Sequence, residues 1–259
     1  MTDLFLLPGI VCDRAVWARV LPALPPAVRC HIPDYGAADT ITAMAQGVLA
    51  DAPATFSLAA HSMGTRVALE IVRIAPQRVE RLALLAGAYK PLPAGAPGQL
   101  EVEKRYHLLD LARREGMRAM AREWVRGMVH PERLTDAVLI EEIEAMIEQK
   151  TPEILAAQIK ALLDRPDAGP VLAALPVPLW LIAARQDAWS PLSQQEEMAA
   201  LARSAQLRII EQCGHMSPME QPEQVASALR EWLASDLERR EASEHLFGSV
   251  PGHTRHDGL

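Results

Sequence analysis

The chain has 259 residues, with 49% hydrophobic and 23% charged residues, and this composition is typical of a globular domain with a full core. Its net charge of −7 excludes a general nucleic-acid binder, which is normally basic. The apolar N-terminus carries Asp3 and Pro8-Gly9, which a signal peptide would not have, and no apolar stretch approaches the length of a membrane span. Together with an odd set of three cysteines, these features predict a cytoplasmic protein without nucleic-acid or membrane partners.

Short runs that are apolar on both sides recur along the chain, as expected for parallel strands covered by helices on both faces. The expected strands are Leu4–Leu7, Arg29–Ile32, Phe56–Ala60, Leu82–Ala86, Leu179–Ala183 and Leu207–Ile210. Helical patterns lie between them, at Val16–Leu21, Ile41–Asp51, Thr65–Ala75, Gln194–Ala202 and Pro222–Leu237. This alternation predicts an α/β fold with a doubly wound, mostly parallel sheet.

One interval between two expected strands contains no strand pattern. Its helical patterns cover Gln99–Glu115, Met117–Val129, Thr135–Lys150 and Pro152–Leu163. We therefore expect residues 1–90 and 171–238 to form the core and residues 91–170 to form an all-helical cap at the carboxyl edge of the sheet, where open α/β folds bind ligands. Residues 239–259 are polar, and we expect a mobile tail in which His245, His253 and His256 bind no metal.

The segment Phe56–Thr65, FSLAAHSMGT, predicts a nucleophile elbow at Ser62. An apolar run breaks into a serine flanked by the small residues Ala60 and Gly64, and a helical pattern follows. A tight strand-to-helix turn needs small neighbours and exposes the serine hydroxyl beside a helix N-terminus. A polar strand end before a capped helix is the alternative on this segment alone.

A serine nucleophile needs a base, and the base needs an orienting acid. His215 follows the last expected strand, on a loop marked by Gly214 and Pro218. Asp187 follows the preceding strand. The order Ser62, Asp187, His215 is the one that this fold class uses, so we expect these three residues to be catalytic. His61 adjoins the serine at a sharp turn and is not expected to be the base.

Two backbone N–H groups are expected to stabilise the oxyanion. Met63 follows the nucleophile, and Ile10 lies in the loop after the first strand, where Gly9 permits a close backbone approach. Met117, Met120, Trp124 and Met128 fall on one helix face, which forms either the cap core or a lid over an apolar substrate. Further candidates for the pocket wall are Val11, Trp189 and Met216.

Two other sets of side chains have structural interpretations. Arg118, Arg122 and Arg126 line a second face of the same cap helix, which we interpret as a solvated face that can pair with the acidic helix containing Glu141, Glu142, Glu144 and Glu148. Cys12 and Cys213 lie on loops at the expected site, and we interpret them as buried, inert thiols.

These motifs resemble the α/β-hydrolase superfamily, and in particular its small bacterial esterase and enol-lactonase group with a helical cap. The resemblance runs from Leu4 to about Leu233. It rests on LLPGIVCDRAVW at the oxyanion loop, AHSMGTRVALEI at the elbow, ARQDAWSP at the acid and CGHMSPMEQP at the base. Ala60 stands where the elbow usually has its first Gly, and Pro8-Gly9 replaces the more common His-Gly.

The expected activity is hydrolysis of small carboxylic esters or lactones through an acyl-enzyme. The same triad is also compatible with C–C bond hydrolysis, cofactor-free peroxidation, acyl transfer or ligand binding with negligible turnover. No metal-binding, phosphate-loop or dinucleotide motif is present in the sequence, so we expect neither a metal nor another cofactor. The sequence leaves the acyl group, the alcohol group and the oligomeric state open.

Overall fold

A six-stranded sheet forms the centre of the protein, with the strand order β2-β1-β3-β4-β5-β6. The computed structural model describes the backbone of residues 2–247 and the side chains of residues 2–235. The strands are β1 (Thr2–Leu7), β2 (Val28–His31), β3 (Phe56–His61), β4 (Val79–Leu85), β5 (Leu179–Ala184) and β6 (Ala205–Ile210). All pairings between these strands are parallel. The predicted fold class is confirmed.

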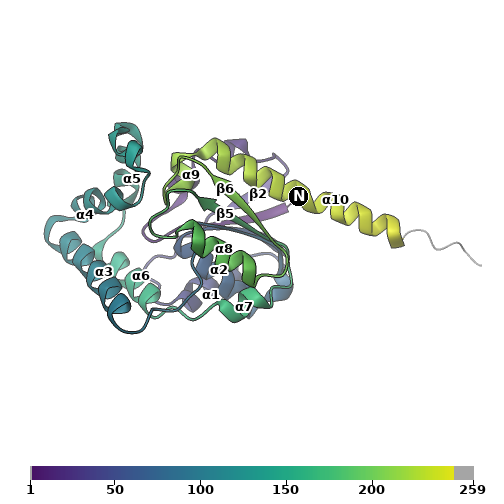
Figure 1. Cartoon of the computed structure of the whole chain (residues 1–259), viewed down its shortest axis with the longest axis horizontal. Helices are drawn as coiled ribbons and strands as arrows, with labels where there is room; N and C mark the ends of the chain where they lie inside the picture. Colours follow the sequence, from purple (N-terminus) through teal and green to yellow (C-terminus); the bar gives the residue numbers. More distant parts are fainter. Residues whose placement is uncertain (1, 248–259) are drawn as a thin grey trace, which may run out of the picture.

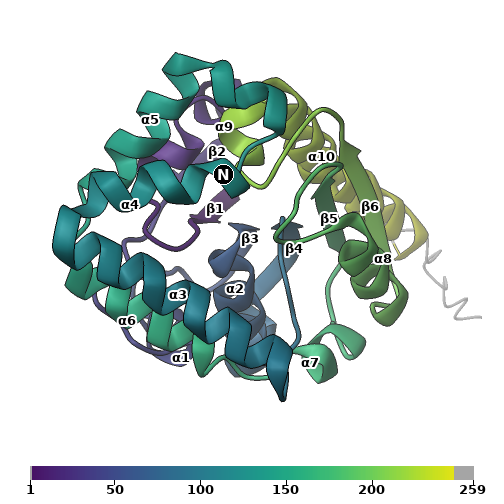
Figure 2. The ribbon, with the colours of Figure 1, turned by 60° about the vertical axis from the view of Figure 1, so that its left-hand side comes forward.

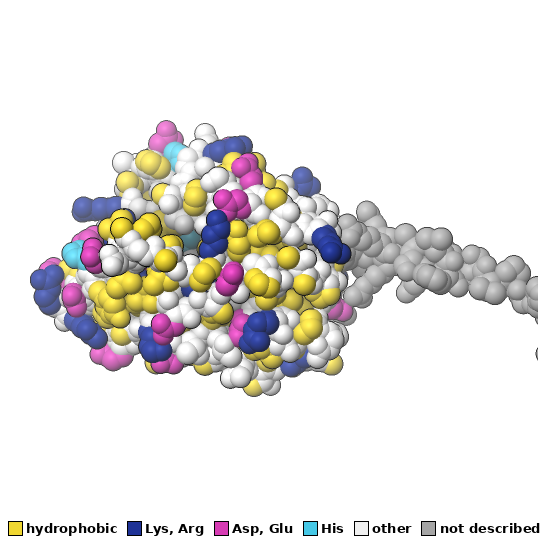
Figure 3. Space-filling model, turned by 60° about the horizontal axis from the view of Figure 1, so that its bottom comes forward, with side chains coloured by type: hydrophobic (Ala, Val, Ile, Leu, Met, Phe, Trp, Pro, Cys, Tyr) yellow, Lys and Arg dark blue, Asp and Glu magenta, His cyan; other side chains and the backbone are white. Residues whose placement is uncertain are grey.

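Helices cover both faces of the sheet (Figure 1). One face carries α1 (Ile41–Asp51), α2 (Met63–Ile74), α7 (Gly169–Ala173) and α8 (Leu192–Leu201), and the other carries α9 (Ser217–Glu220) and α10 (Pro222–Phe247). Every residue of β3 and β5 is buried, which explains why these strands are apolar on both sides. On the face turned forward in Figure 3, charged side chains of both signs are interspersed, as on a surface exposed to water.

Of the α-helices in the chain between β4 and β5, the first four group together at one end of the sheet (Figure 2). They are α3 (Ala96–Glu115), α4 (Met117–Trp124), α5 (Ala137–Glu148) and α6 (Pro152–Leu163), and we call them the helical insertion. Arg118 forms ion pairs with Glu141 and Glu148, and Arg122 pairs with Glu144. The expected pairing of the arginine face with the acidic helix is thereby confirmed for Arg118 and Arg122.

Some element bounds differ from the sequence prediction. The helix expected at Val16–Leu21 is wrong, because two short 3-10 helices, Arg14–Trp17 and Leu21–Ala23, occupy this region. Pro22 and the Pro25-Pro26 pair lack the backbone donors that a continuing α-helix needs. Helix α10 runs past the expected end at Leu237 to Phe247. The rest of the expected tail, residues 248–259, lies outside the described residues.

Close packing between α2 and the end of β1 fixes the position of the turn at Ser62. A Cβ atom at Gly64 would lie 2.5 Å from the carbonyl oxygen of Leu7 and 2.7 Å from that of Pro8. Both neighbours are backbone atoms, which move only with the strand and its loop. The first turn of α2 therefore approaches the exit of β1 as closely as a residue without a side chain permits.

Replacing Gly64 should destabilise the protein. We expect Gly64→Ala to lower the free energy of unfolding by about 1–3 kcal/mol, as overpacking of a rigid site does. Gly47→Ala is the matched control, because Gly47 lies in α1 and a Cβ there would meet no atom within 4 Å. This control should raise stability by about 0.5–1 kcal/mol, since alanine favours a helix interior. Urea denaturation of both variants measures the two effects, and equal midpoints would contradict the packing argument.

Candidate active site

Ser62 occupies a sharp turn between β3, which ends at His61, and α2, which begins at Met63. Its backbone has φ 54° and ψ −118°, a left-handed conformation that a non-glycine residue rarely adopts. Neighbouring groups hold this conformation. The Ser62 N–H donates to the Leu85 carbonyl at 2.9 Å, and the Thr65 N–H and hydroxyl donate to the Ser62 carbonyl at 3.0 and 2.7 Å. The local structure therefore matches the predicted nucleophile elbow.

His215 connects Ser62 to Asp187 by two hydrogen bonds. Its Nε2 lies 2.7 Å from Ser62 Oγ, and its Nδ1 lies 2.8 Å from Asp187 Oδ2. Asp187 follows β5, and His215 lies in the loop between β6 and α9. A carboxylate can only accept a hydrogen bond, so Nδ1 carries the proton and Nε2 is left to accept one from the serine. The structure thus brings the three residues together in the geometry of an activated serine.

Asp187 is held in its charged form although its side chain is buried. Burial by itself would raise its pKa, but the charge and hydrogen bond of His215 lower it, and so do two backbone hydrogen bonds. The N–H groups of Trp189 and Ser190 donate to Asp187 Oδ1 at 2.8 and 2.9 Å. The pKa of Asp187 consequently lies below its usual value, and the carboxylate stays ionised next to the imidazole.

His61 is not a competing base. Its Nε2 donates to the backbone carbonyl of His215 at 2.8 Å, and its ring is buried. Burial, followed by the nearby charge of His215, lowers the pKa of His61 to about 3. Its edge-on contact with Trp17, which is fully buried, fits a structural role under the loop after β1.

The two backbone N–H groups expected to face the oxyanion, those of Ile10 and Met63, have no hydrogen-bond acceptor among residues 2–247. Both residues line the same cavity as Ser62. A Cβ at Gly9 would lie 3.2 Å from that of Ser62, so the loop after β1 approaches the serine as closely as was expected. Buried amides without a partner are rare, and here both are available to a ligand.

Gln158, on α6 of the insertion, holds the loop after β1 and was not predicted from the sequence. Its Oε1 accepts the Val11 N–H at 2.7 Å, and its Nε2 donates to the Gly36 carbonyl at 3.1 Å. Val11 has φ 49°, which is unfavourable for a β-branched residue. The buried amide of Gln158 therefore stabilises a strained residue directly after Ile10.

A second contact joins the insertion to the His215 loop. The Met128 carbonyl accepts the His215 N–H at 2.7 Å. Glu220 lies beneath this loop, is fully buried, and accepts the N–H groups of Gly214, Met216 and His130 at 3.0, 3.0 and 2.7 Å. The backbone of His215 is thus fixed by groups from α9 and from the insertion together.

A cavity of about 600 Å³ opens in front of Ser62 and His215. Among the residues predicted for the pocket wall, Trp124, Met128 and Trp189 line this cavity. Val11 and Met120 line a smaller space of about 20 Å³, which Trp124 and Trp189 also border. Met117 and Met216 are buried and line neither space. The helix expected at Met117–Val129 ends at Trp124 and is followed by a 3-10 helix, Val125–Gly127, so Met128 lies beyond α4. Met117 thus packs in the interior, while Trp124 and Met128 border the site.

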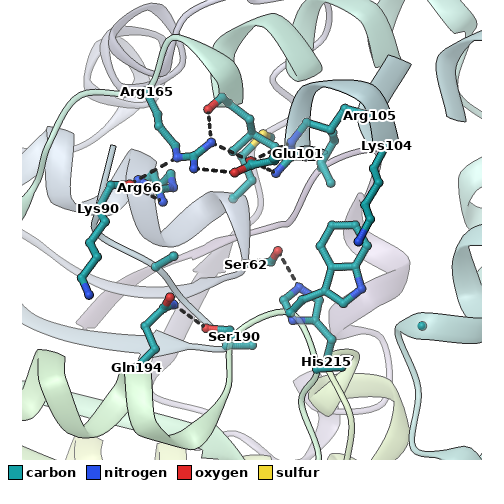
Figure 4. Close-up of a pocket in the computed structure, with 18 of the residues that line it drawn as sticks. Ser62, Arg66, Lys90, Glu101, Lys104, Arg105, Arg165, Ser190, Gln194 and His215 are labelled. Atoms are coloured by element: carbon teal, nitrogen blue, oxygen red, sulfur yellow. Dashed lines mark hydrogen bonds and ion pairs between the residues drawn. The ribbon is translucent and has the colours of Figure 1, made fainter. Parts of the chain in front are cut away.

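Charged side chains also line the cavity. They are Arg66, Lys90, Glu101, Lys104, Arg105 and Arg165 (Figure 4). Most of them come from the insertion or from the segment that leads into it, whereas Arg66 lies on α2. The sequence gives one signal for this cluster, a lone arginine four residues after Ser62.

The two cysteines near the site are expected to be unreactive. Cys12 and Cys213 are buried. Burial, and then the charge of Asp13, raises the pKa of Cys12 to about 12, and burial raises that of Cys213 well above its usual value. Both side chains therefore remain protonated thiols at neutral pH, as expected for structural cysteines.

The His, Cys, Asp and Glu side chains of residues 2–235 form no group of three that could hold a metal ion. No helix in the described part of the chain is both long enough and apolar enough to cross a membrane.

Comparison with known proteins extends the resemblance seen in the motifs. A pimeloyl-[acyl-carrier protein] methyl ester esterase of Photobacterium profundum is 28% identical over 244 residues, which are 90% of this chain and 94% of that protein. An esterase structure from Thermogutta terrifontis, with malate bound, has a TM-score of 0.80 and 28% identity and covers 91% of this chain and 90% of its own. The structure of the enol-lactonase from Burkholderia xenovorans LB400 has a TM-score of 0.76 and 22% identity. The match covers 90% of this chain and 91% of that one, and it shows that the two share a fold.

Residues 4–228 also match the family described as "Alpha/beta hydrolase family", and this range contains all of β1 to β6 except the first residues of β1. The chain therefore belongs to the alpha/beta hydrolase family.

Proposed function

We propose that this protein is a serine hydrolase that cleaves small carboxylic esters or lactones through an acyl-enzyme on Ser62. The observation that carries the proposal is the unbroken chain of hydrogen bonds from Ser62 Oγ through His215 to Asp187. Ser62 lines a cavity, and the unpaired backbone N–H groups of Ile10 and Met63 belong to residues that line the same cavity. Two sequence relatives and one solved structure that each match about nine-tenths of the chain are named esterases, which supports ester bonds as the target.

The first half of the reaction follows from the positions of the hydrogen-bonding atoms. His215 Nε2 takes the proton of Ser62 as Oγ attacks the carbonyl carbon. The carbonyl oxygen becomes an oxyanion and accepts the N–H groups of Ile10 and Met63, which bind no other group beforehand. The imidazolium then gives its proton to the leaving alkoxide. The alcohol departs, or remains attached in the case of a lactone, and the acyl group stays on Ser62.

The second half uses the same groups. His215 Nε2 takes a proton from a water molecule, whose oxygen attacks the acyl carbon. The second oxyanion collapses, and Ser62 Oγ leaves with the proton from His215. The products are the free carboxylic acid and the restored serine. Asp187 remains ionised throughout and stabilises the imidazolium in both halves.

Removing the nucleophile should abolish the activity. We expect Ser62→Ala to lower the release of p-nitrophenol from short acyl esters by about 10⁴-fold or more. A fluorophosphonate probe should label the parent protein at Ser62 and leave the folded variant unlabelled. Release at the parental rate from a Ser62→Ala protein free of contaminating esterase would reject the proposal.

Asp187 should act on kcat rather than on substrate binding. In Asp187→Asn the amide presents its NH₂ group to His215 and disfavours the tautomer that accepts the serine proton, so we expect kcat to fall by about 10³–10⁴ with little change in KM. Asp51→Asn is the control, because Asp51 is an exposed carboxyl on α1. Steady-state kinetics of both variants on one ester measures the effect, and an unchanged kcat in Asp187→Asn would remove the acid from the mechanism.

Gln158 should affect the oxyanion through the loop that it holds. Leucine has a similar volume but accepts no hydrogen bond, so Gln158→Leu leaves the Val11 N–H unpaired and releases the strained loop. We expect kcat to fall about tenfold or more, but by no more than the 10²–10³ that the loss of a whole donor costs, while KM changes little. Gln149→Leu is the control on the same insertion, because Gln149 is exposed. Equal kcat values in parent and Gln158→Leu would show that the loop needs no such support.

A further inference from the structure

The charges on the cavity wall do not balance. Five cationic side chains line the cavity, namely Arg66, Lys90, Lys104, Arg105 and Arg165, and Glu101 is the one carboxylate among its lining residues. Lys90 has its own partner, since its Nζ lies 2.6 Å from Glu197. For the other four cations, Glu101 is the one carboxylate that the cavity lining offers. Such an excess of one charge in a pocket raises the local concentration of ligands of opposite charge.

Glu101 is already engaged by two of the arginines. Arg165 donates to both of its oxygens, from Nη1 at 2.7 Å and from Nη2 at 2.8 Å. Arg105 donates to Glu101 Oε1 from Nε at 2.9 Å and from Nη2 at 2.8 Å. One carboxylate thus compensates two guanidinium groups, and it leaves no charge for Arg66 or Lys104.

Arg66 is the most informative of these groups because its side chain is buried and unbalanced. The residue is 8% exposed, its Nη2 donates to the Lys90 carbonyl at 2.9 Å, and its Nη1 is buried with no acceptor among the described residues. Its carbonyl partner is neutral, and no carboxylate in the described part of the chain forms a hydrogen bond or an ion pair with it. Buried arginines are normally paired with an anion.

Two further effects oppose a cation at this position. Arg66 lies in the first turn of α2, where the positive end of the helix dipole disfavours it. Burial, and then the charge of Arg165, lowers the pKa of Arg66 to about 9, and Glu101 and Asp167 offset this only in part. The guanidinium nevertheless remains protonated at neutral pH. Arg66 thus stays charged although burial, the helix dipole and the positive charge of Arg165 all disfavour it. A bound anion would stabilise a charge in this position.

Lys104 adds an accessible charge to the same wall. It is exposed, and no ion pair forms at its ammonium group within residues 2–247. In Figure 4 its side chain extends from α3 toward the level of Ser62 and His215, while Arg66 and Arg165 lie together on the other side of the view. The cavity wall therefore carries one exposed cation, Lys104, and the buried guanidinium groups of Arg66 and Arg165.

We propose that this part of the cavity is a subsite for an anionic oxygen group of the substrate, so that the ester cleaved at Ser62 also carries a carboxylate or a phosphate. The inference rests on the proposed hydrolysis at Ser62. Guanidinium groups suit both anions because their N–H fork matches two oxygens at once. The subsite comprises Arg66, Lys104, Arg105 and Arg165, with Glu101 as the carboxylate that orients two of the arginines.

Ser62 and Arg66 lie close together in the chain. Ser62 directly precedes α2, Arg66 lies in the first turn of that helix, and both line the same cavity. The substrates to test first are therefore those in which a short chain joins the reacting carbonyl to the anionic group. Half-esters of short dicarboxylic acids have this form, with one end esterified and the other ionised.

The test compares matched pairs of esters. Monomethyl and dimethyl esters of succinic, glutaric and adipic acid differ within each pair in one charge. We expect the parent protein to have the higher kcat/KM on the monomethyl ester of at least one pair. Arg66→Met keeps the length of the side chain and removes its charge, and it should reduce the ratio of the two kcat/KM values about tenfold or more, the effect of one charged hydrogen bond.

Two further variants keep the test decisive. Lys104→Met alters an exposed residue and so should fold normally, and it should reduce the same ratio if Arg66→Met does not fold. Arg203→Met is the matched control, because Arg203 is exposed and does not line the cavity, and it should leave the ratio unchanged. An equal fall of the ratio in Arg203→Met would assign the preference to the overall charge and overturn the subsite.

A third arm identifies the anion. Methyl esters of a phosphate-bearing acid of the same length are assayed beside the half-esters, and the group with the larger loss in Arg66→Met is the one that the subsite binds. Hydrolysis of both members of every pair at equal kcat/KM, with ratios that Arg66→Met and Lys104→Met leave unchanged, would overturn the subsite and leave the proposed function intact. Failure of the parent to hydrolyse any ester would instead reject the function.

Discussion

The contact between Gly64 and the backbone carbonyls of Leu7 and Pro8 is the constraint on which the site depends. It places the first turn of α2 against the end of β1. This is the topological switch point of the sheet, because β2 lies on one side of β1 and β3 lies on the other. Ser62 is thereby held at φ 54°, and the amides of Met63 and Ile10 face one cavity. A Cβ at Gly64 would separate the two segments, so the strain at Ser62 and the unpaired amides have a common origin in packing.

The helical insertion supports this arrangement from above the sheet. Gln158 binds the Val11 N–H behind the proposed oxyanion donor, and the Met128 carbonyl binds the N–H of His215. The base and the oxyanion loop thus each have a backbone hydrogen bond to the insertion. An insertion held in this way does more than cover the substrate, because any rigid displacement of α6 or of the segment after α4 would break a contact behind a reacting group. Substrate access through small local movements is consistent with these bonds.

How much the sequence predicts depends on how local each signal is. The six strands and the turn at Ser62 were predictable because apolar runs and small flanking residues act within a few positions. Asp187 and His215 were found from their place after neighbouring strands, since parallel strands deliver their ends to one edge. Gln158 carries no local signal, because its partner Val11 lies 147 residues away. The cationic wall was missed for the same reason: Arg165 and Glu101 lie 64 residues apart, and either alone reads as a surface charge.

The chain as a whole is negative, with a net charge of −7, whereas the wall of the cavity is locally positive. Net charge governs solubility, whereas the field inside a low-dielectric pocket is set by the few charges that line it. The indole ring of Trp189 lies beside the imidazole, with the centres of Trp189 and His215 6.3 Å apart, whereas the guanidinium groups of Arg105 and Arg165 bind Glu101. The proposed hydrolysis of an ester would release a carboxylate next to this wall, so the cations proposed to attract an anionic substrate would also favour the charge that forms during its cleavage.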